Sequence, residues 1–167
     1  MRRPSANSTV VKKAHTDKNV VVVNSHSRKV AYLSPTQAGK KHDKKVADEA
    51  TISYPPHATL GKDTGFQGYE PKAVISWQPT KKPKGQPLSV EAKHLNVLLA
   101  SARIVVEHVL AGVKRCRIVK DTLRNTKPGF SDTVMEIACA LHNLRTHFRQ
   151  PVPTLNIFDV LLDSYSE

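Results

Sequence analysis

The longest regular pattern in the 167-residue chain runs from residue 89 to residue 113 and predicts one long amphipathic helix. Apolar side chains recur in this stretch every three or four residues, the spacing that places them on one helix face. They are Leu95, Leu98, Ala102, Val105, Val109 and Val113. Ser89 is a suitable N-cap, and Glu91 places a negative charge in the first turn, where the helix dipole favours it. The pattern therefore predicts a helix with a buried stripe.

Glu107 lies off this stripe. It shares a helix face with small and basic residues at spacings of three, four and seven, namely Ala100, Arg103, Ala111 and Lys114. Considered alone, Glu107 is a solvated helix residue paired with Arg103 one turn earlier, an interaction worth about 0.2–0.5 kcal/mol.

Strand patterns come before the long helix. Residues 18–23 and 29–33 are apolar or strand-forming and flank a polar turn, which predicts an antiparallel hairpin. Residues 40–50 predict a short, solvated helix with Val46 and Ala47 facing inward.

Two further short strands are expected at residues 58–60 and 73–77. Asp63 follows the first of them, at a junction between strand and loop. On its own, such an aspartate is usually a turn residue whose side chain bonds nearby backbone. Residues 79–87 combine three prolines, a glycine and three lysines and predict a basic loop, whose lysines either track a DNA backbone or are simply solvated.

A last helix is predicted from residue 131 to residue 148, with Ser131 as its cap. Its expected buried face consists of Val134, Ile137, Leu141, Leu144 and Phe148. Strands, a helix, a further strand and long helices in this order indicate the mixed α/β class.

The charge balance indicates a polyanionic partner. The chain has 26 Lys and Arg residues against 14 Asp and Glu residues, a formal net charge of +12 and a predicted pI near 9.9. Because the positive charge is spread along the whole chain, nucleic acid is favoured over a membrane surface. No apolar stretch is expected to reach the roughly 18–20 residues that span a bilayer, so a soluble, intracellular protein is predicted.

The two cysteines are too few for a disulfide framework, which agrees with a reducing compartment. A zinc site built on Cys139, His142 and His147 is disfavoured, because no second pair of ligands has suitable spacing.

Several segments together resemble the catalytic domain of bacterial insertion-sequence transposases of the DDE superfamily, related to the Harbinger-type nucleases. Residues 12–19 resemble the family's KKxHTxKN segment, and residues 34–43 resemble its SPxxPGxxHD segment. Residues 63–66 resemble the turn that holds the second catalytic aspartate, and residues 103–115 resemble the helix that holds the catalytic glutamate. Residues 125–126 and 136–145 are similar to the family's C-terminal end. The order and spacing of these signals make the resemblance specific.

The resemblance covers residues 9–149 and implies a ribonuclease H-like mixed sheet with flanking helices. Residues 1–8 are expected to be a disordered basic lead-in, and residues 150–167 are an unassigned tail. The resemblance also implies that Asp63 and Glu107 are catalytic residues and ligands of a divalent metal, Mg²⁺ or Mn²⁺. Hard carboxylate oxygens suit these ions and their phosphodiester chemistry.

The expected partner is DNA, both transposon ends and target, in the cytoplasm and nucleoid of a bacterium. Five basic residues are candidates for phosphate contacts, namely Arg103, Lys114, Arg115, Lys12 and Lys13. No membrane partner is expected, whereas a homodimer or a complex with full-length transposase remains open.

The family's first aspartate, in a segment similar to V-D-G-T, has no counterpart in this sequence. The expectation is therefore a truncated transposase with an incomplete sheet, because the strand that carries this aspartate is the central one. Such a chain is predicted to be inactive alone. The alternative is a non-catalytic basic DNA-binding remnant, or an inhibitor of a full-length transposase; an unrelated RNA-binding protein is poorly supported because no RNP-like aromatic pattern occurs.

Overall fold

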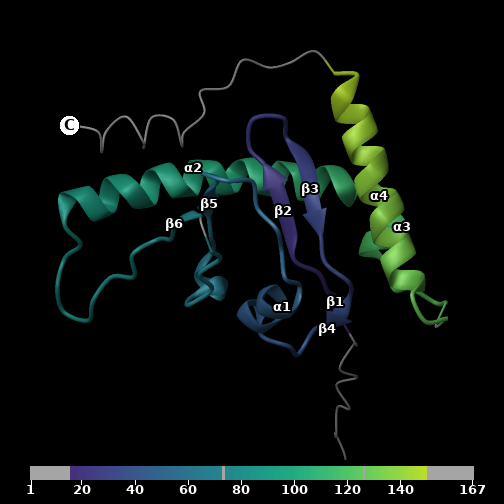
Figure 1. The fold of residues 1–167 in the computed structure, drawn as a ribbon, viewed down its shortest axis with the longest axis horizontal. Coiled ribbons are helices and arrows are strands. Elements are labelled where there is room, and N and C mark those ends of the chain that lie inside the picture. Colours follow the sequence, from purple (N-terminus) through teal and green to yellow (C-terminus); the bar gives the residue numbers. More distant parts are fainter. Residues whose placement is uncertain (1–15, 73, 126, 150–167) are drawn as a thin grey trace, which may run out of the picture.

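The computed structural model describes residues 16–72, 74–125 and 127–149. It is a mixed α/β structure, as the sequence predicted, with helices and short strands arranged as Figure 1 shows. The strands are β1 (Asp17–Lys18), β2 (Val21–Asn24), β3 (Lys29–Leu33), β4 (Gln37–Ala38), β5 (Thr59–Gly61) and β6 (Ile75–Trp77). The helices are α1 (Asp43–Glu49), the 3₁₀ turn η1 (Thr64–Phe66), α2 (Val90–Val113), α3 (Arg117–Lys120) and α4 (Phe130–His147).

The six strands of the described part form three separate pairs. Strands β2 and β3 form the predicted antiparallel hairpin, in which Val21 lies opposite Leu33. Strands β1 and β4 are also antiparallel, whereas β5 and β6 are parallel. The α/β class is thus confirmed, while a continuous ribonuclease H-like sheet stays a prediction.

One hydrophobic cluster lies around α1. It contains Val20, Val46, Ala47 and Tyr69, and Leu60 of β5 packs against it. Val46 and Ala47 therefore face inward, as predicted. This cluster fixes both sides of the segment that carries Asp63, because Leu60 precedes that segment and Tyr69 ends it.

A second cluster joins the end of α2 to α4 and the hairpin. Its buried members are Val113, Ala138 and Cys139, with partly buried apolar residues of β3 and α3 around them. The side chain of Asn143 fastens α4 to β3, because it accepts a hydrogen bond from the Val30 N–H (2.8 Å) and donates one to the Val30 carbonyl (2.9 Å).

Helix α2 forms where it was predicted and runs horizontally across the upper half of Figure 1. The Ser89 hydroxyl oxygen caps it by accepting a hydrogen bond from the Ala92 N–H at 3.1 Å. The predicted buried stripe was only partly right. Val109 and Val113 are buried, whereas Leu95, Leu98, Ala102 and Val105 are only partly buried, and the buried Leu99 lies outside the stripe. The end of α2 is the part that packs against α4, through Val113, and the exposed side of the helix includes Val97 and Ile104.

The expectation that no stretch is long and apolar enough to span a bilayer was wrong for α2. Within the described residues, this helix meets that criterion by length and composition, although only 17% of the relevant window is buried. Core helices of soluble proteins meet the same criterion, so the helix is weak support for a membrane segment.

Two expectations for α4 were also wrong. The helix begins at Phe130, after Gly129 as N-cap, whereas the Ser131 hydroxyl donates a hydrogen bond to Asp17 at 2.8 Å. Four residues of the predicted face are exposed instead of buried, namely Ile137, Leu141, Leu144 and Phe148.

The physical reason is that a different face of α4 fits the hairpin better. Val134, Ala138, Cys139 and His142 are its buried residues, and two of them are small enough for close approach to Val113. Polar groups on this side add hydrogen bonds to the hairpin, including one between His142 Nε2 and the Arg28 carbonyl (3.0 Å). The apolar periodicity of the sequence could not predict these hydrogen bonds.

Candidate active site

Asp63 lies where the parallel strand pair ends. Its carboxylate accepts a hydrogen bond from the Thr64 N–H at 2.7 Å and caps the turn η1. Its backbone carbonyl accepts a hydrogen bond from the Gln78 side chain at 2.9 Å, and the preceding Lys62 N–H donates to the Trp77 carbonyl at 2.8 Å. Asp63 is therefore both the turn residue that its sequence context suggests and a side chain held at the end of a strand.

Lys62 braces the loop that carries Asp63. Its side chain is only 3% exposed, and its ammonium group donates hydrogen bonds to the Tyr69 carbonyl and to the Glu70 carboxylate (2.7 Å). These bonds join the two ends of the loop, Lys62 and residues 69–70, on its buried side. Sequence reasoning missed this residue because a lysine at a strand end is ordinarily solvated, and only its β5 context could have indicated burial.

Glu107 and Arg103 project from the middle of α2, one turn apart. Arg103 Nε donates to Glu107 Oε1 at 3.0 Å, which confirms the pairing expected from the helical spacing. A terminal nitrogen of the same guanidinium lies 3.7 Å from Asp63 Oδ1. Arg103 therefore joins the two carboxylates that the sequence singled out, and the three side chains are 49–63% exposed.

This arrangement suits a cation. Two carboxylates that are far apart in sequence approach one positive charge from a loop and from a helix. Their oxygens are hard ligands of the type that divalent cations prefer. Among the described residues, however, no group of three His, Cys, Asp or Glu side chains is placed to hold a metal ion. Asp63 and Glu107 could therefore provide two of the ligands of a divalent-metal site.

The other residues predicted to contact phosphate form no ion pair with Asp63 or Glu107 among the described residues. Lys114 and Arg115 are exposed immediately after α2, while Lys12 and Lys13 lie outside the described residues. Arg103 is engaged with carboxylates rather than directed at solvent alone. Of the five candidates, the structure therefore brings only Arg103 to the two carboxylates, within the described residues.

Histidine and cysteine residues of α4 have structural roles. His142 is buried, and its Nδ1 lies 3.2 Å from an Arg145 nitrogen while its Nε2 bonds the hairpin. Burial raises the pKa of the Cys139 thiol. Both residues hold α4 in place.

Two further resolved pKa shifts lie elsewhere. Burial, followed by a hydrogen bond with Tyr69, raises the pKa of Tyr54. A hydrogen bond from its own backbone N–H, followed by one from Ser89, lowers the pKa of Glu91.

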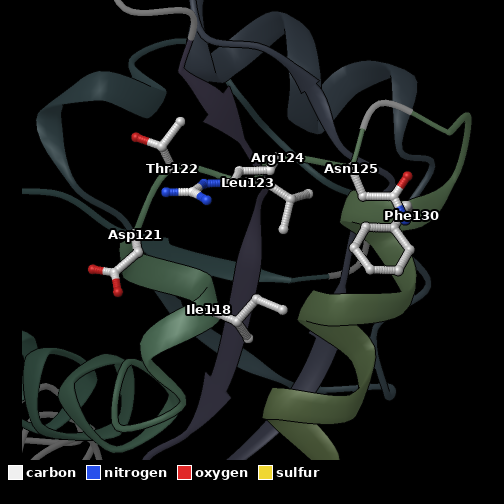
Figure 2. A pocket seen from close by; sticks show the side chains of 7 residues that line it. All are labelled: Ile118, Asp121, Thr122, Leu123, Arg124, Asn125 and Phe130. Atoms are coloured by element: carbon white, nitrogen blue, oxygen red, sulfur yellow. The ribbon is translucent and has the colours of Figure 1, made fainter.

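An open hollow lies between α3 and the start of α4. Figure 2 shows the apolar side chains of Ile118, Leu123 and Phe130 around it, together with the guanidinium of Arg124. It is lined by none of the candidate catalytic residues. The ion pairs of Arg103 with Asp63 and Glu107 therefore lie outside this hollow.

Comparison with known proteins agrees with the resemblance. A family model described as DDE superfamily endonuclease matches residues 2–143. The chain is also 32% identical, over 111 residues, to a probable transposase for insertion sequence element IS702 from Microchaete diplosiphon. That match covers 66% of this chain and 40% of the relative. No solved structure matches significantly. Since the family model spans most of the sequence, the chain belongs to the DDE superfamily endonucleases.

Proposed function

We propose that this chain is part of the catalytic domain of an insertion-sequence transposase, with a ribonuclease H-like fold when complete. In this proposal Asp63 and Glu107 are the second and third acidic ligands of a divalent metal site. The observation that carries it is the guanidinium of Arg103, which has both carboxylates within 3.7 Å. Members of the family generally depend on divalent metal ions, which agrees with such a site.

The chemistry follows from the donor set. Mg²⁺, or Mn²⁺ in its place, would activate the oxygen that attacks a DNA phosphodiester and stabilise the oxygen that leaves. Asp63 and Glu107 would hold the ion, and water or a DNA 3′-hydroxyl would be the nucleophile. Lys114 and Arg115, both exposed beside this surface, would bind the phosphates of the same strand.

We further propose that the chain alone binds DNA without cutting it. Two carboxylates are present where the family's chemistry uses three, and the described residues offer no third ligand beside them. DNA binding without cleavage would make this chain a competitor of intact transposase at the same DNA, in the bacterial cytoplasm and nucleoid. A complex with intact transposase, or a homodimer, would supply the missing ligand from a second chain.

A plasmid-nicking assay tests these statements. Supercoiled DNA with Mg²⁺ or Mn²⁺ should stay intact with this chain alone. Nicking that disappears in Glu107→Gln, but persists in the matched control Glu136→Gln on α4, would show that the chain is an active nuclease and overturn the inactivity proposal.

Salt dependence of DNA binding tests the phosphate contacts. Each phosphate contact contributes about 0.9 to the slope of log affinity against log salt on duplex DNA. Lys114→Ala and Arg115→Ala should each lower the slope by roughly that amount. Lys93→Ala, an exposed lysine near the other end of α2, should leave the slope unchanged if the DNA lies beside Glu107.

A further inference from the structure

The turn that follows Asp63 packs against the N-terminal end of α1. A Cβ atom at Gly65, in the middle of η1, would lie 2.7 Å from Asp43 Oδ2. This distance is shorter than a van der Waals contact, so the Asp43 carboxylate occupies the space that a side chain at position 65 would need. Asp43 is the first residue of α1, and the same helix also contacts η1 through apolar groups, since Phe66 packs against the cluster that contains Val46.

Limited space, and not backbone conformation, is what requires glycine at position 65. Among the described glycines, those with a positive φ angle are Gly68, Gly85 and Gly129, and Gly65 is not one of them. An alanine at position 65 would therefore cause no backbone strain but would collide with the Asp43 carboxylate. The position of the η1 backbone thus depends on where this carboxylate is held.

Lys18 holds the carboxylate against the turn. Its ammonium group forms an ion pair with Asp43 Oδ1 at 2.8 Å and donates a hydrogen bond to the Lys41 carbonyl at 3.1 Å. Asp43 is therefore fixed to β1 through one oxygen and faces Gly65 of η1 with the other. Figure 1 shows the corresponding arrangement, with α1 between the β1–β4 pair and the segment that follows β5.

This contact brings together three segments that resemble separate motifs of the transposase family. Lys18 belongs to residues 12–19, Asp43 to residues 34–43 and Gly65 to residues 63–66. Among these segments, the proposed function assigns a metal ligand only to the last, at Asp63. The structure connects the first two segments to that ligand through the turn that begins beside it.

We infer that Asp43, fixed by Lys18, is a positioning residue for Asp63. The Asp43 carboxylate sets where η1 lies. The turn in turn orients the Asp63 carboxylate, which accepts a hydrogen bond from the Thr64 N–H at 2.7 Å. Asp43 thus acts on the metal ion through Asp63 and is not itself a ligand. The inference rests on the proposed function, in which Asp63 and Glu107 bind a divalent ion.

Titration of the full chain with Mn²⁺, followed by the electron paramagnetic resonance signal of the free ion, tests this role. Asp43→Ala should weaken Mn²⁺ binding about 10-fold, the lower end of the loss typical of residues that orient a metal ligand without touching the metal. Asp48→Ala is the matched control, because it removes the same charge from the same helix together with an ion pair to Lys44 (2.6 Å). Its Mn²⁺ affinity should stay close to that of the unaltered chain.

A double variant separates positioning from direct coordination. Gly65→Ala alone should weaken Mn²⁺ binding, because its methyl group and the Asp43 carboxylate compete for one space. In Asp43→Ala this space is free, so adding Gly65→Ala should cause no further loss. Non-additivity of this kind is expected of two residues in contact. Loss of a ligand at position 43 would instead leave the two effects additive.

Lys18→Gln tests the same contacts without altering α1 or η1. Positioning predicts weaker Mn²⁺ binding, because the Asp43 carboxylate loses its anchor. Charge alone predicts the opposite, because removal of a cation favours the binding of another cation. Lys18→Gln therefore decides the question even if far-UV circular dichroism shows that Asp43→Ala does not fold.

The inference is overturned by unchanged or tighter Mn²⁺ binding in Lys18→Gln, by an equal loss in Asp43→Ala and Asp48→Ala, or by additive losses in the double variant. Glu107→Gln distinguishes these results from a failure of the proposed metal site. Weaker binding in Glu107→Gln with unchanged binding in Asp43→Ala would remove the positioning role alone. Binding that is unchanged in Glu107→Gln would remove the metal site, and the positioning role with it.

Discussion

Replacing Arg103 with glutamine should tighten divalent-metal binding by Asp63 and Glu107 when no DNA is present. The guanidinium now neutralises both carboxylates, so a metal ion has to displace it or bind beside it against charge repulsion. Glutamine has a similar extended shape but no charge. Its side chain therefore removes the competing cation and leaves both candidate ligands in place.

The distances set the size of this effect. At separations of 3.0 and 3.7 Å, each charge pair is worth about 1 kcal/mol by Coulomb's law in water. Exposed pairs measured in proteins give about 0.2–1 kcal/mol, and these side chains are 49–63% exposed. Loss of both pairs thus corresponds to about 0.5–1.5 kcal/mol, or roughly a 2- to 10-fold gain in metal affinity.

Titration with Mn²⁺, followed by the electron paramagnetic resonance signal of the free ion, measures this gain directly. Lys114→Gln is the matched control, because it removes the same charge at the C-cap of the same helix, seven residues beyond Glu107. The gain should shrink in high salt, since exposed charges are screened. Metal binding that is unchanged or weaker in Arg103→Gln, or equally tightened in Lys114→Gln, would refute the competition.

Three other changes test how the site and its support are built. Lys62→Met should lower the free energy of unfolding by about 1–3 kcal/mol in denaturant titrations, because it leaves a buried carbonyl without its donor; a more stable variant would mean that burying the charge costs more than its bonds with Glu70 return. Gly112→Ala should destabilise by about 1–3 kcal/mol, since its new Cβ would lie 2.4 Å from the buried His142 ring; an unchanged melting temperature would contradict this contact. Cys139 should react with iodoacetamide far more slowly than a free thiol at pH 8.5, because burial raises its pKa and lowers the thiolate fraction; equal rates would show that the thiol is accessible.

Local elements were predictable wherever periodicity and a terminal signal coincided. The Ser89 cap and the apolar repeat located α2, and the polar turn between two β-branched runs located the hairpin. Asp63 and Glu107 were singled out from the order of several weak signals, none of which would identify a site alone, and their catalytic role stays a prediction. The short helix α3 had no such signal, because four residues do not establish a period.

The remaining features depended on tertiary contacts. The burial of Lys62 results from a loop that returns seven residues later, and the buried face of α4 is set by hydrogen bonds to a hairpin more than a hundred residues earlier. Apolar periodicity takes only apolar side chains into account. It does not predict the hydrogen bonds that Asn143 and His142 form with backbone groups of the hairpin. For this reason the sequence predicted burial of the more apolar face of α4. The face that is buried in the structure is the one that forms more hydrogen bonds to the hairpin.

The ion pair between Arg103 and Glu107 is expected whether Glu107 is an ordinary solvated helix residue or a ligand of a catalytic metal ion. A helix pair of this kind needs no explanation beyond spacing. The contact of Arg103 with Asp63 is different, because it connects α2 to a loop 40 residues away in the sequence. A surface salt bridge of this length adds little stability, so stability alone is a weak reason to keep two carboxylates around one cation. A site that must hold a more strongly charged cation supplies a stronger reason, and the affinity of Arg103→Gln for Mn²⁺ measures which reason applies.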